Sequence, residues 1–127
     1  MKNVVTNAGD FAPTAFCPQF HHAVELIGRR WTGAIIRAML YGGFTRFSDL
    51  TQAIPGLSDR MLSERLKELE SEGIVHRIVF PETPVRIEYQ ITEKGRALGD
   101  VLTSIGEWAA VWLEGVEPAA AGLAATL

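Results

Sequence analysis

Residues 58–73, SDRMLSERLKELESEG, carry the signals of a complete helix: its start, its buried face and its end. Ser58 is suited to the N-cap, where its hydroxyl accepts a hydrogen bond from a free backbone N–H, and Gly73 is suited to the stop. Leucines recur between them at Leu62, Leu66 and Leu69. This spacing predicts an amphipathic helix with one face in the core and one polar face.

A pattern of period two replaces the helical pattern directly after Gly73. Residues 74–80 are rich in β-forming side chains, and residues 85–91 alternate apolar and polar positions. Pro81 and Pro84 lie between the two segments. Two strands joined by a proline-bearing loop predict a β-hairpin next to the helix.

Three shorter helices are predicted before this stretch, over residues 18–27, 33–42 and 47–54. Pro18 suits the first turn of a helix, which places Cys17 at the N-cap. Thr32 is expected to cap the second helix, and Pro55-Gly56 to break the third. The turn after the third helix is short and contains glycine, which is typical of a helix-turn-helix.

A long helix is predicted after Thr92. Its apolar face is wider than one small core can bury. Pairing with the first helix of a second subunit would cover this face. The alternative is that the β-hairpin and the second helix cover it within one chain. The residues expected at the dimer interface are Phe20, Val24, Ile27, Leu102, Ile105, Trp108, Ala109 and Trp112.

Together these elements predict an α+β fold that is mainly helical. It is a winged helix-turn-helix with a two-stranded β-hairpin wing and with N- and C-terminal dimerisation helices. One folded domain is expected over residues 16–116. A flexible N-terminal arm is expected over residues 1–15 and a disordered tail over residues 117–127, because neither segment shows a periodic pattern.

The formal net charge of −3 is unusual for a nucleic-acid binder, but the charges are unevenly distributed. Eleven of the twelve Lys and Arg residues and nine of the fifteen acids lie between Arg29 and Arg96, so this segment carries +2. Such a weak positive balance permits DNA binding without demonstrating it. One cysteine, no apolar leader and no run of ~20 apolar residues lead us to expect a cytoplasmic protein with no membrane partner.

The polar face of the leucine-bearing helix carries the candidate DNA-binding residues. A helix of this size fits the major groove, where Arg60 can bond guanine and Glu64 can accept from cytosine. Lys67, one turn later, is better placed for a phosphate of double-stranded DNA. The alternative is a solvated face with ion pairs three and four residues apart. The full set in this helix is Ser58, Arg60, Met61, Ser63, Glu64 and Lys67.

Further DNA contacts are expected from outside this helix. Arg77 and Arg86, one on each strand of the wing, are candidates for contacts to phosphate or to a neighbouring minor groove. The alternative is that each arginine pairs with a glutamate of the wing. Thr45 and Arg46, at the start of the third helix, are candidate phosphate contacts through side chain and exposed amides.

Cys17 is a candidate sensor. A thiolate at a helix N-cap is stabilised by the helix dipole, and His21 lies one turn further along. Oxidation, adduct formation or an intersubunit disulfide at Cys17 is then a way to change the dimer and its DNA binding. In the alternative, Cys17 is a small buried hydrophobe. Cys17, His21 and His22 suggest a metal site, and Cys17 and His21, four residues apart on a helix, could share one ion. Zinc usually takes three or four ligands, however, and the sequence has no further Cys and His76 lies far along the chain, so we expect neither a metal nor a cofactor.

An enzyme and a protein-binding module are the competing functional classes. The sequence has no Gly-rich phosphate loop, no metal-ligand motif and no nucleophile elbow, so no catalytic residues are expected. A hydrolase built on Cys17 and His21 stays an alternative on sequence alone. A winged helix that binds a protein instead of DNA is the second alternative.

The chain resembles the HxlR-type transcriptional regulators over residues 17 to about 113. The shared motifs occur in order: Cys17-Pro18, Trp31-Thr32, Arg46-Phe47, the helix from Met61-Leu62 to Leu69-Glu70, and the wing Pro81…Pro84…Tyr89. The resemblance implies a winged-helix dimer of MarR-like architecture that binds a pseudo-palindromic operator as a repressor or an activator. It also implies a DNA-binding segment from Arg60 to Lys67, a wing contact at Arg86 and, as in several members, a Cys17 that senses oxidants, quinones or aldehydes.

Overall fold

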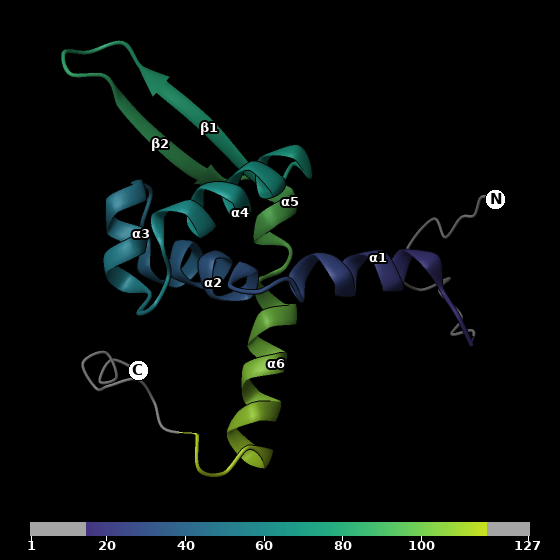
Figure 1. Cartoon of the computed structure of the whole chain (residues 1–127). Coiled ribbons are helices and arrows are strands. Elements are labelled where there is room, and N and C mark those ends of the chain that lie inside the picture. The colour runs from purple at the N-terminus through teal and green to yellow at the C-terminus, as the bar shows by residue number, and fades with distance from the viewer. Residues whose placement is uncertain (1–14, 117–127) are drawn as a thin grey trace.

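The computed structural model describes residues 15–116, which form helices and one β-hairpin (Figure 1). In chain order these are α1 (Pro18–Ile27), α2 (Thr32–Gly42), α3 (Phe47–Ala53), α4 (Asp59–Ser71), β1 (Val75–Phe80), β2 (Arg86–Ile91), α5 (Glu93–Arg96) and α6 (Gly99–Trp112). The predicted fold class is confirmed. The arm expected over residues 1–15 lies outside the described residues except for Ala15, and the tail expected over residues 117–127 lies wholly outside them.

The predicted caps of α1 and α4 are confirmed. Cys17 is the N-cap of α1, where its Sγ accepts from the Phe20 N–H at 3.5 Å. Ser58 caps α4 by accepting from the Met61 N–H at 3.1 Å. Gly73 follows α4 with a positive φ of 78°, a backbone conformation that favours glycine, and turns the chain into β1. Both helices therefore begin where a side chain satisfies a free backbone donor.

The start of α2 differs from the prediction by one residue. Thr32 is the first residue of the helix and is buried, whereas the N-cap is Trp31, which has a φ of 75° and makes no side-chain cap bond. The Trp31 indole packs against the core, and its ring lies near the backbone of Gly56. Burial of a large aromatic surface offsets the cost of its unfavourable backbone conformation.

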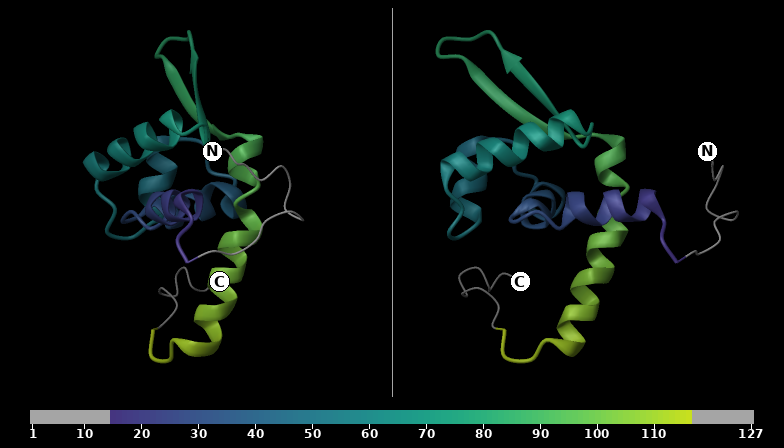
Figure 2. Two further views of the ribbon diagram at one scale, coloured as in Figure 1. Left: turned by 90° about the vertical axis from the view of Figure 1, so that its right-hand side faces the viewer. Right: turned by 45° about the vertical axis from the view of Figure 1, so that its right-hand side comes forward.

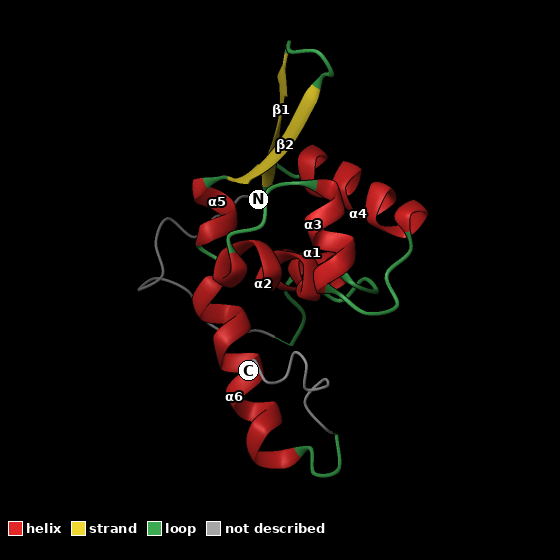
Figure 3. Ribbon diagram, turned by 90° about the vertical axis from the view of Figure 1, so that its left-hand side faces the viewer, coloured by secondary structure: helices red, strands yellow, loops and turns green. Residues whose placement is uncertain are grey.

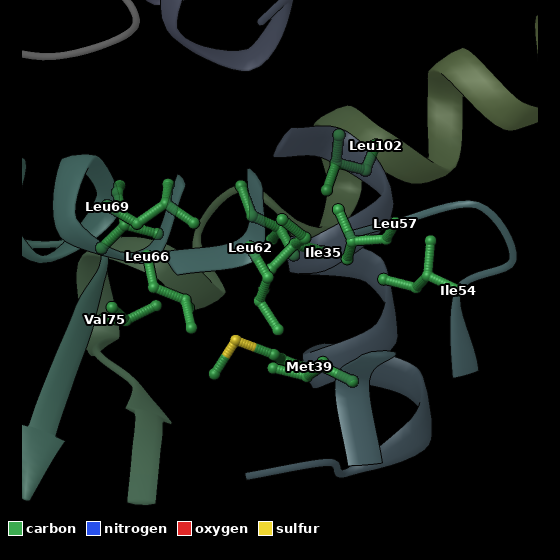
Figure 4. Close-up of a cluster of buried hydrophobic side chains, with 12 residues drawn as sticks. Ile35, Met39, Ile54, Leu57, Leu62, Leu66, Leu69, Val75 and Leu102 are labelled. Atoms are coloured by element: carbon green, nitrogen blue, oxygen red, sulfur yellow. The ribbon is translucent and has the colours of Figure 1, made fainter. Parts of the chain in front are cut away.

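The core lies between α2, α3 and α4 and is closed by the base of the wing and by α6 (Figure 4). Leu62, Leu66 and Leu69 of α4 are all buried, as their spacing predicted. Each such side chain contributes roughly 1.5–3 kcal/mol of burial free energy. The other buried apolar residues are Ile35, Ile36, Met39, Leu50, Ile54, Leu57, Ile74, Val75 and Leu102. This packing fixes α4 with its polar face outward.

The wing is a two-stranded antiparallel hairpin with Val75 opposite Ile91 and Phe80 opposite Arg86. It projects from the helices on one side of the molecule, and α6 extends on the opposite side (Figure 2). The Tyr89 N–H donates to the Thr45 carbonyl at 2.8 Å, so the segment before α3 lies along β2. The sequence did not predict this contact.

The prediction of a single long helix after Thr92 is wrong. The chain forms two helices, α5 and α6, with a break at Ala97 and Leu98 (Figure 3). Thr92 caps α5 by accepting from the Gly95 N–H at 3.1 Å. A Cβ at Gly95 would lie 2.5 Å from the Ile74 carbonyl oxygen, so α5 packs closely on the chain between α4 and β1. Over residues 15–116, no helix is long and apolar enough to cross a membrane.

Candidate nucleic-acid interface

The polar face of α4 is open to solvent in the described part of the chain. Arg60, Ser63, Glu64 and Lys67 are exposed, and Met61 is half-buried at the edge of the core. The Arg60 Nε lies 3.4 Å from the Glu64 Oε2, so one of the ion pairs expected on a solvated face is present. The Arg60 side chain is nevertheless 90% exposed, and such an exposed pair is weak enough for a DNA base to replace it.

The opposite flank of α4 is tied to the N-terminal part of the chain by polar contacts that the sequence did not predict. Arg65, whose side chain is only 13% exposed, donates to the Arg30 carbonyl at 2.8 Å and pairs with Glu68 at 2.9 Å. Glu68 also lies 3.7 Å from Arg29. These contacts hold α4 against the segment between α1 and α2, which leaves its other flank free.

The two wing arginines have different surroundings. Arg86 pairs with Glu82 at 2.9 Å and with Glu88, and its guanidinium lies 3.8 Å from the centroid of the Phe80 ring. The hydrogen bond from Arg86 lowers the pKa of Glu82 below its ordinary value. The structure therefore favours the alternative in which Arg86 pairs with glutamates of the wing. Its guanidinium then stabilises the wing and is not available to bind a DNA phosphate. Arg77 is exposed, and within residues 15–116 it forms no ion pair.

The start of α3 lies beside the wing. Arg46 is exposed at the N-cap of α3, and its positive charge adds to the lowering of the pKa of Glu82 in the wing loop. Thr45 is half-buried, and its carbonyl is used by the Tyr89 N–H. Of these two candidate phosphate contacts, the structure thus leaves Arg46 with the more accessible side chain.

The candidate dimer residues divide into an exposed group and a buried one. Phe20 and Val24 of α1 and Ile105, Trp108 and Trp112 of α6 are exposed, while Ile27 and Ala109 are half-buried. The expectation that Leu102 lies at the dimer interface is corrected by its burial. Leu102 is only 5% exposed because it packs into the core of its own chain, and it is therefore removed from the proposed interface.

Cys17 is half-buried at the start of α1. His21, expected to assist it, instead lies 3.3 Å from Glu25 on the same helix, and His22 lies 3.2 Å from Glu72. Among the described residues no group of three or more His, Cys, Asp or Glu side chains is arranged to hold a metal ion. The thiol therefore shares no ligand cluster with these two histidines.

This arrangement defines a class of protein. A helix-turn-helix of α3 and α4 with an exposed second helix, followed by a β-hairpin wing, is the architecture of a winged helix-turn-helix DNA-binding regulator. The model of the HxlR-like helix-turn-helix family matches residues 26–117, and the chain belongs to this family.

Two relatives come from Bacillus subtilis. The HTH-type transcriptional regulator YvaP is 52% identical over 98 residues, which cover 77% of this chain and 90% of YvaP. The HTH-type transcriptional regulator YodB is 48% identical over 93 residues, which cover 73% of this chain and 82% of YodB. The relatives are transcriptional regulators and not enzymes, and this chain is a DNA-binding transcriptional regulator.

Solved structures of two redox-related regulators resemble the fold. Reduced YodB matches with a TM-score of 0.70 at 45% identity, over 80% of this chain and 99% of that one. The redox regulator HypR in its reduced form matches with a TM-score of 0.70 at 33% identity, over 76% of this chain and 94% of that one. YodB has also been solved after diamide treatment and with bound quinone.

Proposed function

We propose that the chain binds DNA as a homodimer and recognises a pseudo-palindromic operator with the polar face of α4. The observation that carries this proposal is that Arg60, Ser63 and Lys67 stand exposed on one helix while leucines on its other side anchor it in the core. The major groove of duplex DNA admits such a helix, and its base edges distinguish all four base pairs. The protein then acts in the cytoplasm, where the bacterial chromosome is accessible.

Exposed apolar side chains on α1 and α6 support the dimer. Phe20 is 66% and Trp108 is 58% exposed, and both belong to helices that extend away from the core. Large apolar patches of this kind on soluble proteins mark contact surfaces. In the proposed dimer, α1 and α6 of the two subunits pack together, and recognition of half-sites about 34 Å apart requires both copies of α4 to face the same side.

A gel shift with DNA from upstream of the chain's own gene tests the proposal. We expect a retarded complex whose affinity falls steeply as salt rises, because binding releases counterions from the phosphates. A footprint on the same DNA should show two protected half-sites. If the folded protein binds no duplex at low salt, the function is wrong and the protein-binding module replaces it.

We further propose that Cys17 makes this DNA binding responsive to oxidants or electrophiles. The relatives YodB and HypR support the proposal, because structures of YodB include diamide-treated and quinone-bound forms and HypR is described as a redox regulator. The chain has one cysteine, so an internal disulfide is impossible. Reversible oxidation, an adduct or a disulfide between two subunits are the available reactions.

The sensor is tested by treating the full chain with diamide or with benzoquinone and measuring DNA affinity. Wild-type protein should change its affinity, whereas Cys17→Ser should bind DNA equally well before and after treatment. Equal responses of the two proteins, or no response of either, would contradict a sensing role for Cys17.

A further inference from the structure

A polar cleft of about 350 Å³ lies between α4 and the wing, and it is lined by Ser63, Lys67, Glu70, Arg77 and Tyr89. Two regular elements build it. Ser63, Lys67 and Glu70 are spaced by four and three residues on α4, so they share one face of the helix. Arg77 and Tyr89 are direct partners in the antiparallel ladder, so their side chains stand next to each other on one face of the hairpin.

The two cations of the cleft are not neutralised by ion pairs. Over residues 15–116, neither Lys67 nor Arg77 has a carboxylate within ion-pair distance. Glu70 lines the same cleft, so the charges sum to one positive charge. This contrasts with the tip of the wing, where Arg86 is held by two glutamates. The positive site of this region is therefore at the base of the wing and not at its tip.

Tyr89 adds a neutral donor to these charges. Its backbone is fixed by the hydrogen bond from its N–H to the Thr45 carbonyl, and its half-buried side chain lines the cleft. No hydrogen bond of its hydroxyl to the described part of the chain is found. The Ser63 hydroxyl lies on the facing helix and is a second neutral donor.

We infer that this cleft binds one phosphate of the DNA backbone, with Lys67 and Arg77 sharing its charge and Tyr89 and Ser63 donating hydrogen bonds to its oxygens. A phosphodiester carries one negative charge and accepts several hydrogen bonds, which matches two cations and two hydroxyls around one space. This inference rests on the proposed DNA binding. It assigns Tyr89 a role in that binding and places the backbone between the C-terminal half of α4 and the base of the wing.

The test measures the affinity of the full chain for the footprinted duplex over a range of salt concentrations. Tyr89→Phe keeps the ring but removes the hydroxyl, so it should weaken binding to all sequences on the order of tenfold without changing the salt dependence. The slope of log affinity against log salt is negative. In the double variant Lys67→Gln with Arg77→Gln it should become less steep by about 0.9 per protomer, because only one phosphate contact is lost. Two separate phosphates would give a decrease of about 1.8 per protomer.

Two further variants complete the test, one inside the cleft and one control outside it. Glu70→Gln removes the carboxylate of the cleft and should tighten binding. Arg37→Gln removes one positive charge beside Gly106 of α6, the helix that extends opposite to the wing, and should leave the salt dependence unchanged. Wild-type affinity in Tyr89→Phe, or a slope decrease of about 1.8 in the double variant, overturns the shared site while DNA binding stands. Loss of the wild-type gel shift would instead overturn the proposed function.

Discussion

The Nε2 of His22 in α1 lies 3.2 Å from the Oε2 of Glu72, the residue that directly follows α4. This pair connects the helix that begins at Cys17 with the helix that carries the candidate DNA-binding face. A polar cleft of about 330 Å³ separates the two helices, and Lys67 of the candidate DNA-binding set lines it. A displacement of α1 would therefore change a contact at the C-terminal end of α4.

Replacing His22 with Ala should leave stability almost unchanged, because an exposed pair contributes less than about 1 kcal/mol. It should, however, reduce the change in DNA affinity that follows modification of Cys17. The matched control is His21→Ala, since within residues 15–116 His21 pairs with Glu25 of the same helix and contacts the Phe16 ring just before α1. Urea unfolding and gel shifts with and without diamide measure both effects. If the two variants respond to diamide alike, the pair does not transmit the signal.

The wing should become less ordered in acid. Arg86 lowers the pKa of Glu82 in the folded protein, so the contribution of this pair is complete above the unfolded pKa and is lost as pH falls through the folded pKa. Glu82→Gln should therefore lose less stability than wild type as the pH falls below the ordinary glutamate pKa of 4.5. Hydrogen exchange of wing amides measures this, with Glu93→Gln as the control for an exposed carboxylate outside the wing. Identical pH profiles for Glu82→Gln and wild type would show that the Arg86–Glu82 pair does not stabilise the wing.

Gly95→Ala should destabilise the protein by about 1–3 kcal/mol, because the new Cβ would lie 2.5 Å from the Ile74 carbonyl oxygen and backbone must move. Gly33→Ala is the matched control. Its nearest neighbour would be the Ile27 carbonyl at 3.9 Å, so it should be neutral or stabilise α2 by up to about 1 kcal/mol. Urea unfolding of both variants provides the comparison. A Gly95→Ala variant as stable as wild type would show that α5 is not closely packed.

Trp108→Glu should convert the proposed dimer to monomers and abolish the two-half-site footprint, because a charge is placed in the exposed apolar face of α6. Val85→Glu is the control for oligomeric state, since Val85 is an exposed apolar residue of the wing loop. Sedimentation of the full chain distinguishes the two. A Trp108→Glu variant that sediments as wild type would move the interface elsewhere.

Much of the fold could be predicted because its signals are local. The caps at Cys17 and Ser58 depend only on neighbouring residues, and so does the alternating sequence that predicts β2, although all residues of this strand except Gln90 are half-buried. The two errors depend on tertiary contacts that have no local pattern. Trp31, with its unusual backbone, is partly buried and packs its ring against the core, and the helix after Thr92 breaks beyond the close contact of Gly95 with Ile74.

The candidate site divides in the same way. Leucine spacing was sufficient to predict which face of α4 is exposed, and Arg60 and Lys67 follow from it. The sequence could not decide whether Arg86 is free or paired, because that depends on how the wing loop folds back toward Glu82. Contacts between distant segments, such as His22 with Glu72, were not predictable at all, since no pattern relates residues fifty positions apart.

Recognition of a particular operator by α4 requires Arg60, on the free face of this helix, to contact base edges. The most direct test compares wild type and Arg60→Ala on the footprinted duplex and on a set of duplexes with one base pair changed. At the position that Arg60 contacts, we expect wild type to discriminate by about 1–3 kcal/mol and Arg60→Ala to bind all four base pairs alike. If Arg60→Ala keeps the full base preference of wild type at every position, α4 does not recognise the operator through Arg60, which contradicts the proposed reading of DNA.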